Sequence, residues 1–224
     1  MQEFKRTTAG NNSISKRKLV CGVGVNDAGY NVTSYSNGRE FMCQIYARWK
    51  SMLQRCYNKL CQDRHPTYRG CSVCDDWLIF SNFAAWYELN YVYGYDLDKD
   101  IKIKGNRVYS PETCLLVPRA INGLILDCPK SRGSYPVGVS FHKQHNKFIA
   151  KISIDRKRKH LGYFHSAEEA GNAYIKAKNK EITRKSAQYP EFSEYLMKHR
   201  IKCDADIRSL CSDGFARAFY EANK

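Results

Sequence analysis

Hydrophobic and polar residues alternate with a period of two in three successive segments of this chain, residues 137–142, 147–154 and 159–164. Such alternation predicts β-strands with one covered face, because successive side chains of a strand point to opposite sides. In the middle segment the two sets of side chains are Phe148, Ala150, Ile152 and Ile154 on one side, and Lys147, Ile149, Lys151 and Ser153 on the other. We therefore expect a three-stranded sheet with one apolar face.

A helix is predicted directly after these strands. Ser166 and Glu169 have the spacing of a capping box, in which the hydroxyl and the carboxylate satisfy unpaired amides of the first turn. Beyond them an apolar stripe recurs at helical spacing, formed by Ala170, Ala173, Tyr174 and Ala177. Because three of these four residues are alanines, the helix can lie close against one face of the sheet, and the other face stays bare.

The first half of the chain contains two stronger helical patterns. From Phe41 onward, apolar residues recur three and four positions apart, at Ile45, Trp49, Met52, Leu53 and Cys56. The second pattern is rich in aromatic residues: Trp77, Phe80, Phe83, Ala84, Trp86 and Tyr87. Aromatic side chains at this spacing form a hydrophobic core far more often than a ligand site, so we assign both helices to a core.

Weaker patterns predict the remaining elements. They are a short hairpin or extended strand within 20–32, a strand to about Ile101, a loop with a turn at Gly105-Asn106, a second strand, a helical turn from Ser110-Pro111, a helical continuation over 115–126, and helices near 192–198 and 207–222. We divide the chain into a flexible basic arm (1–17), an αβ region (18–126), a linker (127–134), the sheet module (135–183) and a helical tail (184–224). The expected fold class is α+β.

The charge of the chain favours a polyanionic partner. Thirty-seven lysines and arginines against 22 acidic residues give a formal net charge of +15. Nucleic acid is the usual partner of so basic a chain, and a membrane surface is the alternative. No apolar run approaches the roughly 20 residues that span a bilayer. Because the first residues also lack the apolar stretch of a signal peptide, we expect a cytoplasmic protein.

The ten cysteines raise the question of a metal site. In a reducing compartment cysteines are thiols or metal ligands rather than disulfides. Cys71 and Cys74 have close ligand spacing, and Cys61, His65 or Cys114 would have to complete a zinc site. A second Cys-x-x-Cys pair is missing, so we favour free thiols over zinc.

The strands and the helix together carry a family resemblance. Gly138-Val139-Ser140, Lys147-Phe148-Ile149-Ala150-Lys151-Ile152 and His160-Leu161-Gly162-Tyr163-Phe164, followed by Ser166-Ala167-Glu168-Glu169-Ala170, resemble the AP2 DNA-binding domain of plant transcription factors and phage endonucleases. The resemblance implies a three-stranded antiparallel sheet that contacts duplex DNA, with Ser140, His142, Lys147, Lys151, Ser153, Arg156, Arg158 and His160 as the contact residues. A basic αβ module with a solvated charged face is the alternative.

The preceding region resembles the HNH-type homing endonucleases of phages that carry an AP2 domain after the nuclease. The similarity lies in the strand–loop–strand pattern around Leu97-Asp98-Lys99-Asp100, Gly105-Asn106 and Ser110-Pro111-Glu112-Thr113. The family places its general-base histidine where this chain has Asp98-Lys99, and a helix ligand where it has Thr113. The candidate catalytic residues that remain are Asp98, Asp100 and Asn106, and the two carboxylates could hold Mg²⁺ if they share a strand face. Otherwise they are exposed, or paired with Lys99, Lys102 or Arg107.

These patterns give two functional hypotheses. The first is a sequence-selective double-stranded DNA-binding protein, derived from a phage homing endonuclease, that regulates or represses by occupying DNA in the host cytoplasm without cutting and without a cofactor. The alternative is an active, metal-dependent HNH-type endonuclease. RNA binding is less favoured, because neither an RNP-type aromatic motif nor a GxxG loop occurs.

Overall fold

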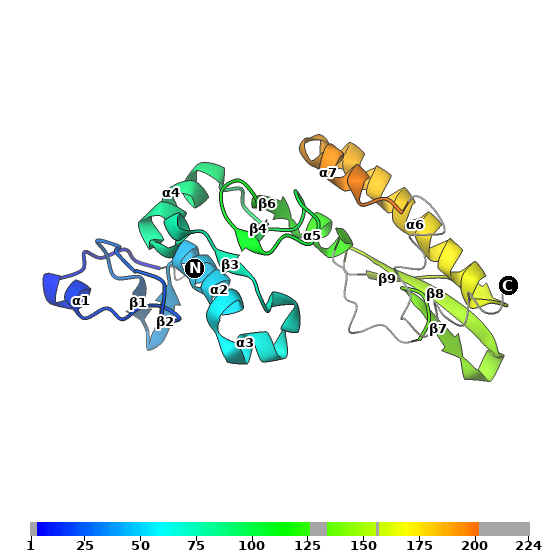
Figure 1. Cartoon of the computed structure of the whole chain (residues 1–224), viewed down its shortest axis with the longest axis horizontal. Helices are drawn as coiled ribbons and strands as arrows, with labels where there is room; N and C mark the ends of the chain where they lie inside the picture. The colour runs from blue at the N-terminus through cyan, green and yellow to red at the C-terminus, as the bar shows by residue number, and fades with distance from the viewer. Residues whose placement is uncertain (1–3, 126–133, 156, 202–224) are drawn as a thin grey trace. The chain divides into compact units, whose positions relative to one another are not determined.

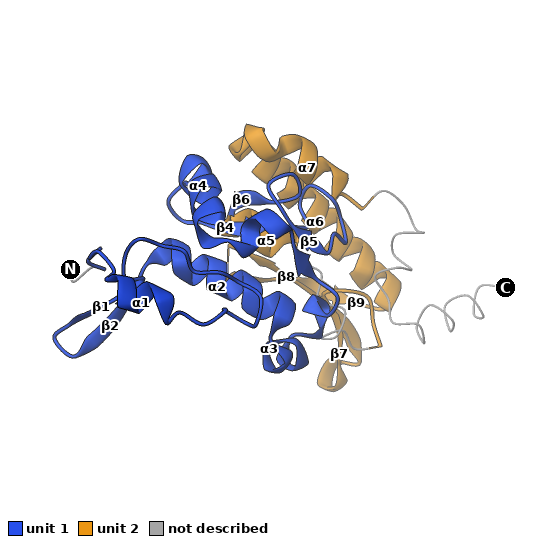
Figure 2. Cartoon of the chain, turned by 60° about the vertical axis from the view of Figure 1, so that its left-hand side comes forward, with its two compact units in different colours: residues 1–117 blue, residues 118–224 orange. Residues whose placement is uncertain are grey.

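In the computed structural model the described residues are 4–125, 134–155 and 157–201. Helices and small sheets alternate along them, so the chain is of mixed α+β class (Figure 1). The chain divides into two compact units, residues 1–117 and residues 118–224 (Figure 2). The sequence predicts a boundary near residue 126. It falls earlier because helix α5 (Arg119–Ile125) contacts strand β8 of the second unit, while residues 127–133 of the expected linker lie outside the described residues.

Residues 4–17, for which the sequence predicts a flexible arm, make hydrogen bonds to residues 26–34 of unit 1. Helix α1 (Asn11–Ser15) is followed by Arg17, whose guanidinium donates hydrogen bonds to the carbonyls of Asn26, Ala28 and Tyr30. The segment 20–32 forms only a turn and isolated bridges instead of a hairpin. The hairpin comes next, as β1 (Thr33–Ser36) and β2 (Arg39–Met42).

The core of unit 1 is aromatic, as the helical patterns predict. It is built on α2 (Gln44–Tyr57) and α4 (Phe80–Asn90), with α3 (Lys59–Arg64) and the 3₁₀ turns η1 (Pro66–Tyr68) and η2 (Asp75–Leu78) beside them. Trp49 is fully buried, and its indole Nε1 donates a 2.7 Å hydrogen bond to the carbonyl of Trp77. This bond satisfies the polar atom of a side chain that packing removes from water.

Two short sheets complete unit 1. Strand β3 (Ser72–Val73) pairs in parallel with β5 (Val108–Tyr109), and β4 (Tyr95–Asp98) pairs with β6 (Leu115–Pro118). The predicted helix over 115–126 is therefore wrong for its first four residues. Hydrogen bonds between Ser110 and Thr113 close a turn, after which Leu116 and Val117 are buried in the strand, and α5 begins only at Arg119.

Unit 2 has the predicted meander and helix. Strands β7 (Val139–His142), β8 (Lys147–Ile154) and β9 (Lys157–Phe164) form an antiparallel sheet in that order, with the 3₁₀ turn η4 (Lys143–His145) before β8. Helix α6 (Ala167–Gln188) runs along the sheet (Figure 1). Ser166 and Glu169 form the capping box. Gly138, at φ +77°, lies so close to the Tyr174 ring that any larger residue would collide with it.

The tail begins inside α6, which continues past residue 183. A 3₁₀ turn η5 (Pro190–Phe192) and α7 (Ser193–Lys198) fold back onto α6, with Phe192 and Leu196 buried. The second predicted tail helix, residues 207–222, lies outside the described residues. Across the described parts of both units, no helix is long and apolar enough to cross a membrane.

Candidate nucleic-acid interface

The register of the sheet gathers the predicted contact residues on one face. Residues directly opposite each other on antiparallel strands share a face. Lys147 pairs with His142, Lys151 with His160, and Ser153 with Arg158, while Ser140 pairs with Ile149. All of the predicted residues except Arg156, which lies outside the described residues, therefore point to the same side. The other side carries Phe148, Ala150 and Ile152, and α6 packs against these strands there.

A β-bulge changes which residues of β9 reach this face. The register shifts between Ala150 and Lys151, so that Ala150 pairs with Gly162 and Lys151 with His160. The extra residue is Leu161, and it places Tyr163 on the same face as His160 although the two are three positions apart. Strict alternation would have put Tyr163 with the core. Tyr163 is therefore not predicted as a contact residue from the sequence, since a bulge leaves no signal in a period-two pattern.

Aromatic rings form a cluster around Tyr163, which is 48% exposed. The ring centroids of His142, His145 and His160 lie 5.9, 5.3 and 4.9 Å from that of Tyr163. His142 also stacks on His145 at 4.7 Å, and its Nδ1 is buried without a hydrogen-bond partner among the described residues. Ile149, directly opposite Tyr163, is only 4% exposed. The face is therefore less bare than expected, combining an aromatic patch with cations.

The electrostatic character of the sheet is almost wholly positive. Between residues 139 and 164 the only acidic residue is Asp155, in the turn that joins β8 to β9. Its carboxylate accepts a 2.8 Å bond from Lys185 Nζ and a 3.2 Å bond from Arg184, both on α6. The hydrogen bond from Lys185 lowers the pKa of Asp155. The only carboxylate of this segment is thus paired with cations of α6. It therefore does not neutralise the lysine and arginine side chains of the contact face.

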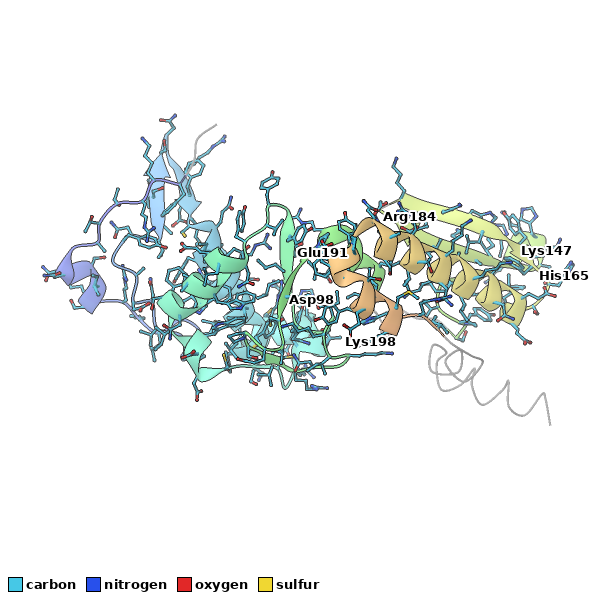
Figure 3. All side chains as sticks on the ribbon, turned by 90° about the horizontal axis from the view of Figure 1, so that it is seen from above. Asp98, Lys147, His165, Arg184, Glu191 and Lys198 are labelled. Atoms are coloured by element: carbon cyan, nitrogen blue, oxygen red, sulfur yellow. The ribbon has the colours of Figure 1, made fainter. Side chains whose placement is uncertain are left out.

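A hollow borders several of the contact residues and extends to the side of the sheet on which α6 packs. A cavity of about 430 Å³ is lined by Ser140, Lys151, Ser153 and Arg158, together with residues of α5 and α6. Lys151, Ser153, Arg158 and His160 are all exposed. In Figure 3, Lys147 is labelled near one end of this unit and Arg184 nearer the other.

The predicted nuclease residues lie together in one loop of unit 1, but not in the expected geometry. Strand β4 ends at Asp98, whose Oδ1 accepts the backbone N–H groups of Asp100 at 2.8 Å and Ile101 at 2.7 Å. Asp98 and Asp100 therefore do not share a strand face, because this turn ends the strand between them. Burial raises the pKa of Asp98.

The same loop is closed by Lys99 and Asn106. The Nζ atom of Lys99, which is 7% exposed, lies 2.8 Å from both carboxylate oxygens of Asp100 and 2.6 Å from the carbonyl of Asn106. The Asn106 amide donates to the carbonyls of Lys99 and Val108 at 2.9 and 2.6 Å. Thr113, which the resemblance aligns with a helix ligand, donates to the same Val108 carbonyl at 2.7 Å. Of the expected alternatives, Asp100 shows the pairing with Lys99, whereas the Asp98 carboxylate is engaged by backbone N–H groups.

The cysteines of unit 1 are free thiols in the structure. Burial raises the pKa of Cys71 and Cys74, and that of Cys56 and Cys114 to about 12. The thiolate is the reactive form of cysteine, so these buried thiols are expected to react slowly with alkylating reagents. Over the described ranges, no group of three His, Cys, Asp or Glu residues is placed to hold a metal ion.

Comparisons with protein-family models, curated proteins and solved structures find no match for this chain.

Proposed function

We propose that the chain is a sequence-selective double-stranded DNA-binding protein that inserts the face of the β7–β9 sheet into the major groove. One observation carries the proposal: the register places the predicted contact residues together, on the face opposite the one on which α6 packs. The major groove is wide enough to admit a β-ribbon. The resemblance to the AP2 domain supports the same mode, with action in the host cytoplasm as a regulator that occupies DNA.

Different residues of the face suit different parts of the duplex. Arg158 and Lys151 can donate to guanine, the commonest base-specific contact of these residue types. Lys147, at the end of β8, is placed for a phosphate, and phosphate contacts fix the register of a protein on DNA without reading sequence. Tyr163 offers an apolar surface beside them, which fits a thymine methyl group.

The test separates the two faces of one strand. A binding site is selected from random duplexes with the full chain, and dissociation constants are measured for Lys151→Ala, Arg158→Ala and Lys159→Ala. Lys159 is exposed on the same strand but alternates to the opposite face. We expect a loss of about 1–3 kcal/mol for each of the first two variants and little change for the third. Equal effects of Arg158→Ala and Lys159→Ala would contradict the proposed face.

The second candidate is a metal-dependent endonuclease, favoured by the gathering of Asp98, Asp100 and Asn106 in one loop. These side chains are already engaged by backbone groups and by Lys99. We therefore expect no cleavage when the protein is incubated with Mg²⁺ or Mn²⁺ and a plasmid carrying its selected site. Nicking that depends on the metal and disappears in Asp98→Asn/Asp100→Asn would establish the nuclease instead.

A further inference from the structure

The parallel pair β3–β5 brings together two segments that are far apart in the sequence. Ser72 lies opposite Val108, and the N–H of Ser72 donates a 2.8 Å bond to the carbonyl of Arg107. Because parallel strands begin at the same end, the residues before both strands converge there. The Arg107 guanidinium donates to the carbonyl of Arg69, which fixes the junction.

Exposed cations lie in both chain segments that lead into this junction, two before β3 and two before β5. We call this junction the basic end of unit 1 and define it by the exposed residues Arg64, Arg69, Lys104 and Arg107. One carboxylate, Asp63, lies among them and pairs with Arg69 at 2.7 Å. The opposite ends of the same strands are followed by Asp75, Asp76 and Glu112. The two short strands thus separate positive from negative charge.

The loop that supplies Lys104 and Arg107 keeps its acidic groups engaged. Asp98 binds backbone amides, and Asp100 binds the buried Lys99. The tip, Ile103 to Asn106, is a turn closed by a 3.0 Å backbone bond, with Gly105 at φ +77°. The exposed cations are therefore presented on a loop whose shape is set before any ligand binds, so binding costs little ordering entropy.

We infer that the basic end of unit 1 is a second DNA-contacting surface, which binds the phosphate backbone of the duplex that unit 2 reads, without selecting sequence. The inference rests on the proposed function of unit 2. Exposed lysine and arginine side chains on a loop suit phosphate oxygens, which repeat along any duplex. Since both units belong to one chain, a second contact strengthens the first by raising the effective concentration of DNA.

The test measures how affinity depends on salt. Full-length Arg64→Gln/Lys104→Gln is compared with the wild type and with Lys16→Gln/Arg39→Gln, a control that removes the same charge from exposed positions elsewhere in unit 1. Each protein is titrated with the selected duplex and with an unrelated duplex between low and physiological salt. Circular dichroism verifies folding of each variant.

We expect Arg64→Gln/Lys104→Gln to reduce the slope of log affinity against log salt by about 2, since each lost phosphate contact removes about one. Affinity should fall by the same factor on both duplexes, so that the specificity ratio is unchanged. An unchanged slope, or an equal change in the control, would overturn the second surface while leaving the Lys151 and Arg158 results intact. A wild-type protein that binds no duplex would overturn both proposals.

Discussion

At the scale of single residues, Asp98 shows how local backbone needs can occupy a side chain that a family resemblance assigns to catalysis. Its carboxylate accepts two backbone N–H groups that no strand partner could reach once β4 has ended. Burial of a carboxylate disfavours its charge, and these two hydrogen bonds act in the opposite direction. Asp98 therefore stabilises the fold as a hydrogen-bond acceptor for two backbone N–H groups.

We predict that Asp98→Ala lowers the free energy of unfolding of unit 1 by about 1–3 kcal/mol, the cost of leaving two amides without an acceptor. Asp98→Asn should recover most of the loss, since the amide oxygen of asparagine accepts the same bonds. Urea unfolding followed by tryptophan fluorescence measures this directly, because Trp49, Trp77 and Trp86 all belong to unit 1. Equal losses in both variants would show that the negative charge matters instead.

The buried thiols give a second prediction at this scale. Burial raises the pKa of Cys56 and Cys114 to about 12, so at pH 8 almost none of either is thiolate, the reactive form. Iodoacetamide should modify both much more slowly in the native protein than in urea, while Cys61, which is partly exposed, should react faster than either of them. Mass spectrometry of digested samples measures each site. Native modification of Cys114 at the rate of Cys61 would contradict its burial.

At the scale of elements, the turn between β8 and β9 is stabilised by ion pairs with helix α6 in addition to hydrogen bonds within the hairpin. Asp155 adopts a left-handed conformation, φ +48°, and is bonded to Arg184 and to Lys185. Lys185 is 3% exposed, and the Asp155 carboxylate 2.8 Å away is the anionic partner of this buried ammonium group. The ion pair ties the hairpin that carries Arg158 to the helix behind it.

This contact predicts a pH-dependent stability. The pKa of Asp155 is lowered, mainly by the hydrogen bond from Lys185, so its stabilisation is present above the ordinary value of 3.8 and is lost as the pH falls through the lower folded value. Asp155→Asn should reduce the stability of unit 2 by about 1 kcal/mol at pH 6, after allowance for solvent screening, and by little at pH 2. Thermal unfolding followed by circular dichroism measures both, with Glu191→Gln as the control for an exposed carboxylate of the same unit. A loss that is equal at both pH values would contradict the ion pair.

At the scale of the whole molecule, the net charge of +15 is distributed over both units. The sheet face contributes Lys147, Lys151 and Arg158, and unit 1 contributes its basic end. On duplex DNA, the partner that we propose, phosphates would relieve the self-repulsion of this charge, and condensed counterions would leave the duplex.

We predict that affinity for duplex DNA falls by roughly a thousandfold or more between 50 and 200 mM salt, as for proteins with six or more phosphate contacts. Fluorescence anisotropy with a labelled duplex measures the slope of log affinity against log salt. The buffer contains no magnesium, because divalent ions compete with the protein for phosphates. A flat profile would contradict the polyanionic partner that the composition indicates.

Local patterns determined much of this protein. The period-two segments, the capping box at Ser166 and the alanine stripe specify β7, β8, β9 and α6, because each signal acts within a few residues. The same alternation assigns Lys151 and Ser153 to the open face. The aromatic helices of unit 1 were predictable for the same reason, since Trp49 and Phe83 lie on stripes that only a core can bury.

Tertiary structure decided what depends on contacts between distant residues. The pairing of Ser72 with Val108, which creates the basic end of unit 1, has no local signal because two-residue strands have no period. The bulge at Leu161, which brings Tyr163 beside His160, exists only in the pairing of β9 with β8. Likewise Asp98 and Asp100 separate because the carboxylate of Asp98 finds backbone amides after β4 ends. A sequence pattern records which face a residue prefers, whereas the partners on that face are chosen by packing and hydrogen bonding across the fold.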